Sequence, residues 1–280
     1  MADQIMTKET ELSVLVPAVW SQKYYDVLLA ELAFNSLISR DYEGDIQALG
    51  DRVKISTIPE FSDAEIVAEA DRADASAVTA TQQELLINKM VAKDFMVTSR
   101  ALLQSIPFME KLKELAIYSI NKKIQAEILS ATVPNAAAPD HSVAYASGTT
   151  LALADILAAK ELLDNANVPM SDRHMVVGAA QLNDIFSITG FTSSDFVASG
   201  APLQSGQLPA QMVGFMPHFT TAVGNTSYFF HSSYMAIAAQ KGLTVGEYAQ
   251  DVNGLRATRV NCDTLLGIKQ LDGLRVVSIA

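Results

Sequence analysis

The sequence contains little cysteine and little charge. Cys262 is the only cysteine among 280 residues, so no disulfide can form within the chain, and we expect a reducing compartment. We predict that Cys262 is a small buried apolar residue rather than a reactive thiol. Charged residues make up 18% of the chain, against roughly 25% in ordinary globular domains. This shortfall favours a surface that other protein covers, although an alanine-rich composition also raises the hydrophobic share.

Clusters of basic residues are missing as well. The net charge is -11, from 20 basic and 31 acidic residues, and no run of three Lys or Arg occurs. Binding to nucleic acid through phosphates needs a concentrated basic surface, so we expect no direct nucleic-acid recognition, although proximity to nucleic acid stays open. The N-terminus does not resemble a signal peptide, and no apolar run approaches the roughly 18 residues that span a bilayer. We therefore expect a protein made in a cytoplasm, with no membrane partner.

The usual sequence motifs of catalytic and cofactor sites are absent. The chain has no Gly-x-Ser-x-Gly elbow and no Gly-x-Gly-x-x-Gly after a strand. Gly200 and Gly206 are spaced almost like a phosphate-binding loop, but no Gly-Lys-Ser/Thr follows them. We therefore predict no enzyme activity and no cofactor. An enzyme whose groups converge only in three dimensions stays an open alternative.

The histidines and acidic pairs also lack the spacing of a site. His141, His174, His218 and His231 stand singly, and none has the i, i+4 spacing of a helical metal site. We predict that His174, on an apolar strand, is a hydrogen-bonded core or edge residue. Carboxylate pairs such as Asp71 and Asp74 fall in an acidic stretch that favours a solvated face. We name no catalytic, cofactor-binding or metal-binding residue.

The first hundred residues predict a helix followed by a projecting hairpin. Apolar residues recur at helical spacing over residues 15–38, behind a polar arm. Val53 and Ile55 then alternate with polar neighbours, as in a strand, and residues 85–97 are strand-like again. Residues 61–81, between these strands, are acidic and poor in large apolar side chains, so they cannot bury much of themselves. A long projecting hairpin and an ordinary flexible surface loop stay equally open.

The strongest helical pattern covers residues 106–129. Ser105 can cap this helix, and Pro107 lies in its first turn, where no intrahelical N–H is needed. Apolar residues such as Ile120 and Ile124 follow at spacings of three or four. The length would be roughly 36 Å at the standard rise, which suits the spine of a flat subunit.

The second half predicts alternating helices and strands, followed by a β-rich ending. Prolines and small residues indicate a domain junction at 133–150. Asp272-Gly273 is a strong signal for a two-residue turn before a closing strand at 274–279. The other expected elements are a helix at 151–163, a buried strand at 173–177, a short helix at 180–186, a loop at 199–211, apolar strands or short helices at 213–223 and 228–239, and β-structure over the last forty residues.

Several of these features occur together in one order. They are Trp20–Asp26, Tyr42–Asp45, Leu49–Ile55, the long helix, Ala180–Asp184, and Met235–Gln240 leading into a Gly-rich β ending. In this order the chain resembles the major capsid proteins of tailed bacteriophages, which have the Hong Kong 97-type fold. The resemblance covers nearly the whole length from about Val16 onward. It depends on the conjunction, because no single feature is diagnostic.

The resemblance implies an α+β fold of the Hong Kong 97 type with four parts. They are an N-terminal arm and helix at 1–40, an extended β-hairpin loop at 41–97, a peripheral domain with the spine helix at 98–147 and 241–280, and an axial domain at 148–240. It implies a structural coat protein that self-assembles through pentamers and hexamers into an icosahedral or prolate head around double-stranded DNA. The chain would then be assembled in the host cytoplasm and located in the virion.

The resemblance also implies partners. The first is the chain itself, followed by a portal and possible decoration proteins, with packaged DNA nearby but not bound by sequence. Some members of the family begin with a long helical scaffolding segment. In this chain the first arm-like element lies too close to the start for such a segment, so we expect a separate scaffolding protein or earlier removal of the segment. Some members cross-link through Lys, Asn and Glu; Lys54, Lys89 and Lys93 fall in the extended loop, but no partner can be named, so we expect no cross-link. An encapsulin-like compartment shell and, less favoured, a soluble α/β enzyme are the alternatives.

Overall fold

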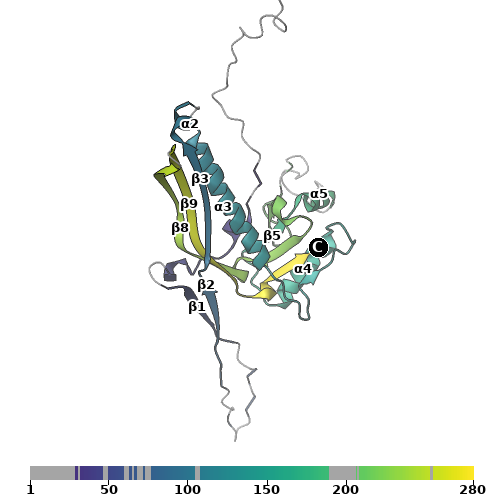
Figure 1. Cartoon of the computed structure of the whole chain (residues 1–280). Coiled ribbons are helices and arrows are strands. Elements are labelled where there is room, and N and C mark those ends of the chain that lie inside the picture. Colours follow the sequence, from purple (N-terminus) through teal and green to yellow (C-terminus); the bar gives the residue numbers. More distant parts are fainter. Residues whose placement is uncertain are drawn as a thin grey trace, which may run out of the picture.

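The computed structural model describes residues 29–30, 32–46, 50–59, 63–64, 66–67, 72, 77–104, 108–188, 206, 208–252 and 255–280. Within them the chain mixes helices and sheets, as the α+β prediction requires. A long three-stranded sheet carries one long helix, a five-stranded sheet forms a second body, and a two-stranded hairpin extends from the end of the long sheet (Figure 1).

The long sheet has the strand order β3-β9-β8, and both pairings are antiparallel. Side chains alternate across it: Val260 and Cys262 are fully buried, while Arg259 and Asn261 point to the opposite face. The predicted burial of Cys262 is confirmed. The strands are β3 (Lys89–Thr98), β8 (Met235–Val252) and β9 (Leu255–Gln270).

Helix α3 (Met109–Ala131) packs along one face of this sheet (Figure 1). Ala116 and Ile120 pack with Val260 and Cys262 because residues four apart share one face of a helix. Its 23 residues extend roughly 34 Å, which confirms the long spine. The helix begins later than expected, with Phe108 at the N-cap and no side-chain cap; the predicted Ser105 cap and Pro107 lie outside the described residues.

The second body is the five-stranded sheet, with the order β4-β10-β7-β5-β6. Its core joins residues of β5 and β7 with α4 and α5, among them Ile156, Leu163, Met175 and Phe229. The helix, strand and short helix expected near 151–163, 173–177 and 180–186 are all present. The elements are β4 (Ser142–Val143), α4 (Leu153–Asn165), β5 (Arg173–Val177), α5 (Ala179–Ser187), β6 (Met216–Phe219), β7 (Ser227–His231) and β10 (Val276–Ile279).

The strand expected at 85–97 is divided between two sheets. Strand β2 (Thr81–Leu86) pairs antiparallel with β1 (Arg52–Thr57) to form the hairpin, whereas β3 pairs with β9 in the long sheet. The hairpin pairing is therefore present, but its second strand ends at Leu86. Just after Leu86, the Ile87 N–H still donates to the Asp51 carbonyl oxygen at the base of the hairpin. From Lys89 onward the chain pairs with β9 instead.

The expected two-residue turn at Asp272-Gly273 is wrong. Asp272 Oδ1 accepts a hydrogen bond from the Leu274 N–H at 2.9 Å and starts a short 3₁₀ helix, which carries the chain from β9 into the other sheet. Strands β8 and β9 pair as far as Val252 and Leu255, and the two residues between them in the sequence, Asn253 and Gly254, lie outside the described residues. Asn-Gly is a strong hairpin signal in a sequence.

The remaining helices are short. Of the helix expected at 15–38, residues 15–28 and 31 lie outside the described residues, and α1 (Phe34–Leu37) is its helical part among the others. Most of the acidic stretch at 61–81, including Asp71 and Asp74, and most of the loop at 199–211 also lie outside them. The short helices are α2 (Ser99–Gln104), η2 (Glu43–Ile46), η3 (Thr221–Val223), η4 (Ser232–Tyr234) and η5 (Gly273–Arg275).

The hairpin approaches the long sheet closely at Gly267 of β9. A Cβ atom added to Gly267 would collide with the carbonyl oxygen of Leu86 and crowd Ile87 Cδ1 at 3.1 Å. Both opposing atoms belong to the junction between β2 and β3. A glycine here therefore sets how closely the hairpin base can lie on the sheet.

We predict that Gly267→Ala destabilises the subunit, because the colliding atom is backbone and cannot rotate away. The expected loss is about 1–3 kcal/mol of the free energy of unfolding, measured by chemical denaturation. Gly242→Ala is the matched control, since a Cβ there meets no atom within 4 Å. Equal stability of the two variants would contradict the prediction.

Candidate interaction surfaces

The described residues contain no group of three or more His, Cys, Asp or Glu side chains that could hold a metal ion. His141 is buried, with Nδ1 3.1 Å from the Val276 carbonyl oxygen, and His231 Nδ1 lies 2.8 Å from Ser233 Oγ. No described helix has the length and apolar character needed to cross a membrane.

His174 and His218 form a pair that the sequence did not reveal. His174 Nδ1 lies 3.2 Å from His218 Nε2, so one ring donates its proton to the other. The two residues are 44 positions apart and meet because β5 and β6 are neighbours. His174 is hydrogen-bonded, as expected, and it lies on an inner strand, since β5 is flanked by β7 and β6.

The pKa of His174 is lowered to about 4, first by burial and then by the nearby His218 and His231, while Asp172 acts in the opposite direction. The ring is therefore neutral at neutral pH. Burial also raises the pKa of the Cys262 thiol, with the carboxylates of Asp94 and Asp263 acting in the same direction. A buried, protonated thiol is a poor nucleophile, which agrees with a structural role for Cys262.

The first candidate surface is the distal hairpin, defined here as Ile58, Ile66 and Val78. The base of the hairpin is anchored: Val53 and Leu85 are buried against Ala236 and Ala238 of β8. Farther out, Ile58 is 70% exposed, Ile66 is fully exposed and Val78 is 42% exposed. Large apolar side chains so exposed on a projecting segment are typical of a surface that another protein covers.

The second candidate surface is the open face of the long sheet, on the side opposite α3. Met90 and Met96 of β3 and Tyr248 of β8 are each more than half exposed there. Among them, Asp94 accepts hydrogen bonds from Arg259 Nε at 3.0 Å and Asn261 Nδ2 at 2.6 Å. This face therefore combines rigid, satisfied polar groups with uncovered apolar ones. Met and Tyr in such a setting are typical of protein interfaces.

At the tip of the same sheet, Leu103 of α2 is 87% exposed.

The three lysines that the resemblance suggested as cross-linking candidates, Lys54, Lys89 and Lys93, are dispersed. Lys54 lies on β1 opposite Glu84, Lys89 forms an ion pair with Glu127 of α3, and Lys93 is exposed on β3. The structure does not bring these three lysines together.

Comparison with known proteins gives one family and one fold. The sequence model of a family described as "Phage capsid protein" matches residues 50–279. No curated protein matches the chain.

Similar folds occur in solved structures from phages. A chain from Mycobacterium phage Che8 is 23% identical, with a TM-score of 0.74, and the match covers 94% of this chain and 96% of that one. The capsid structure of Cyanophage P-SCSP1u is 11% identical with a TM-score of 0.76 (99% and 98% covered). The Cyanophage Pam1 capsid asymmetric unit is 14% identical with a TM-score of 0.73 (100% and 98% covered).

The lowered pKa of His174 predicts an acid-sensitive contribution to stability. The unfolded chain, with an ordinary histidine pKa of 6.5, takes up the proton before the folded chain, whose His174 pKa is about 4. Stability is therefore lost as the pH falls from about 6.5 towards 4. We expect the difference in thermal stability between the native chain and His174→Gln to change little between pH 8 and 7. Below pH 6.5 it should shift steadily against the native chain, and a constant difference down to pH 4 would contradict this.

Proposed function

This chain belongs to the phage capsid protein family, and from that membership we propose that its copies close into an icosahedral or prolate head around double-stranded DNA. It is a structural protein, the major capsid protein of a virion shell. The observation that carries the proposal is the family match over residues 50–279. The distal hairpin and the open face, each exposing large apolar side chains, provide contacts for neighbouring subunits.

Shell closure needs contacts between unlike surfaces of one chain. Such heterologous contacts form rings when the rotation between neighbours closes, as pentamers and hexamers do. Each contact can be weak because every subunit makes several at once. The distal hairpin and the open face differ in shape and composition, so one can bind the other on a neighbouring copy.

The shell does not need to bind its contents tightly. A net charge of -11 without basic clusters favours packaged DNA that lies nearby and is not bound by sequence. We further propose a separate scaffolding protein, a portal and, in some heads, decoration proteins as partners, with assembly in the host cytoplasm. The family favours a phage head over a compartment shell that holds enzymes, and a structural role over an enzyme.

We propose the domain assignment that the resemblance implied. The peripheral domain takes residues 98–147 and 241–280, the axial domain 148–240, the extended loop 41–97 and the arm 1–40. Two pairings connect these parts: β3 of the extended loop joins β9, and β10 joins β7. Strands from different parts therefore pair within one sheet, so these parts cannot move as separate bodies joined by a hinge.

The basic test is the size of the assembly. We expect the expressed chain, with or without a candidate scaffolding protein, to form shells, pentamers, hexamers or sheets in sedimentation and negative-stain microscopy. A stable monomer or dimer under every condition would contradict the proposal.

Deleting residues 61–81 should leave a folded subunit and abolish shell closure. The base of the hairpin is held by Val53 and Leu85, which lie outside the deletion, whereas the deletion removes Ile66 and Val78 of the distal hairpin. Circular dichroism would check the fold and negative-stain microscopy would check the shells. Normal shells from the deleted chain would refute the role given to the hairpin.

The double substitution Met90→Glu/Met96→Glu should block assembly while sparing the fold. Both side chains are more than half exposed in the subunit, but burying two new carboxylates in a contact without partners is costly. We expect at least a tenfold loss of assembled particles by sedimentation, an order-of-magnitude figure equal to about 1.4 kcal/mol. The control is Met90→Leu/Met96→Leu, which keeps the apolar area; loss of assembly in both variants would contradict a specific effect of charge.

A further inference from the structure

Two imidazole rings face each other on the five-stranded sheet. His174 lies on β5 and His218 on β6, the last strand in the sheet order, and the parallel register sets Met216 opposite His174 and His218 opposite Val176. Residues two apart on a strand share a face, so both rings lie on one face of the sheet. His174 Nδ1 is 3.2 Å from His218 Nε2, and the ring centroids are 5.3 Å apart, so these two nitrogens lie between the rings.

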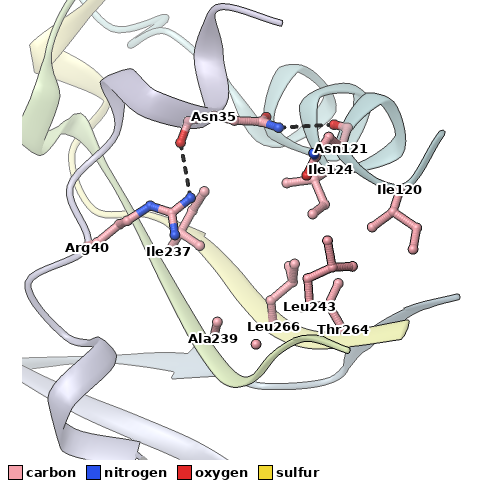
Figure 2. Close-up of a pocket in the computed structure, with 11 residues that line it drawn as sticks. Asn35, Arg40, Ile120, Asn121, Ile124, Ile237, Ala239, Leu243, Thr264 and Leu266 are labelled. Atoms are coloured by element: carbon pink, nitrogen blue, oxygen red, sulfur yellow. Dashed lines mark hydrogen bonds between the residues drawn. The ribbon is translucent and has the colours of Figure 1, made fainter. Parts of the chain in front are cut away.

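Helix α1 covers the neighbouring part of the same face. Phe34 of α1 stacks on Phe230 of β7 with the ring centroids 5.6 Å apart, and the Phe230 ring lies 5.8 Å from the ring of His174. Asn35 Nδ2 holds α1 against α3 by donating to the Asn121 carbonyl oxygen at 3.1 Å (Figure 2). The histidine pair lies beside this fixed apolar layer and is only partly buried, so a small ion can approach it from the solvent.

The separation of the two nitrogens matches that of two ligands on one metal ion. Zn²⁺ binds imidazole nitrogen at about 2.0–2.1 Å with tetrahedral geometry, which puts two such nitrogens about 3.3–3.4 Å apart. The 3.2 Å between His174 Nδ1 and His218 Nε2 is close to this value. The ion would lie beside the line that joins the nitrogens, so the rings need to turn but the strands need not separate.

The proton that the two rings share does not prevent binding. In the hydrogen-bonded pair, one facing nitrogen carries a proton and the other is bare, whereas a metal ion needs both to be bare. The ring that donates can exchange its proton through solvent for one on its other nitrogen, and it stays neutral. Binding therefore replaces one hydrogen bond with two metal–nitrogen bonds and releases no proton.

The surroundings favour a cation that prefers nitrogen ligands. Imidazole suits Zn²⁺, whereas Mg²⁺ and Ca²⁺ select oxygen. The carboxylate of Asp172 acts on His174 in the direction that favours positive charge there. Within the described ranges no third His, Cys, Asp or Glu joins the pair to form a larger group, so water fills the other positions on the ion.

We propose that His174 Nδ1 and His218 Nε2 together bind one Zn²⁺ ion, with water completing its coordination. Bound there, the ion links the inner strand β5 to the outer strand β6 and stabilises the edge of the five-stranded sheet. The site lies within one subunit, so the inference goes beyond the shell proposal and does not depend on it.

The test titrates the full-length chain, without a purification tag, with Zn²⁺ in a calorimeter. We expect one ion per chain to bind at the pair, and an equal concentration of Mg²⁺ should not displace it. His218→Gln keeps a side chain that can hydrogen-bond to His174 but removes the imidazole ligand. It should weaken binding by at least about tenfold, the scale on which metal sites respond to the loss of supporting groups. His174→Gln is the second variant and should have the same effect.

His231→Asn is the matched control. His231 lies outside the pair, and its Nδ1 accepts a hydrogen bond from the Ser233 N–H at 3.2 Å. Asn can provide an acceptor at the same N-cap position, so this variant removes a histidine and should leave Zn²⁺ binding unchanged. Equal weakening in this control and in His218→Gln would overturn the proposal, because the effect would then not be specific to the pair.

Histidine ring NMR identifies the ligand atoms directly. In nitrogen–proton correlation spectra of the imidazole groups, Zn²⁺ should shift Nδ1 of His174 and Nε2 of His218. Thermal unfolding is the second readout: excess Zn²⁺ should raise the melting temperature of the native chain, because an ion that binds only the folded state stabilises it, and should not raise that of His218→Gln. Absence of Zn²⁺ binding, binding that survives in both Gln variants, or ring shifts at other histidines only would each overturn the proposal.

Discussion

The packing of α3 against the long sheet is the contact on which the rest of the subunit depends. Ile120 and Ala116 of the helix meet Val260 and Cys262 of β9 in a fully apolar layer. Ion pairs from Glu127 to Lys89 and from Lys113 to Glu247 hold the helix over β3 and β8 at its two ends. A helix about six turns long, fixed in this way, makes the sheet stiff. The hairpin and the open face are then presented at fixed positions, as repeated contacts in a shell require.

Much of this architecture could be predicted from the sequence, because it follows from local periodicity. The spacing of Ile120, Ile124 and Ile128 predicted the spine, and the last forty residues were correctly expected to be rich in β-structure. The ends of elements were harder, as the division of 85–97 into β2 and β3 illustrates. Both halves have strand character, and the change of partner from β1 to β9 between Leu86 and Lys89 leaves no mark in that pattern. Periodicity gives the type of an element and not its partner.

The surfaces could be predicted much less well. The His174–His218 pair arises from strand neighbours and register, which a single sequence does not contain. The open face is also invisible from composition, because Met90 and Met96 look like core residues until their side of the sheet is known. The shortage of charge favoured a surface that other protein covers, but it did not give the position of that surface. The position of an assembly surface depends on where its residues lie in three dimensions, which the composition of the chain does not give.

The place of β10 has a consequence for how the subunit is made. This strand lies inside the five-stranded sheet, between β4 and β7, yet it follows every other strand of that sheet in the chain. Val276, Val277 and Ile279 are fully buried there. While the ribosome is still translating, the sheet therefore has a gap next to β7, and its pairing must wait for contacts that are distant in sequence and slow to form. A chain that lacks β10 therefore lacks the strand that joins β4 to β7.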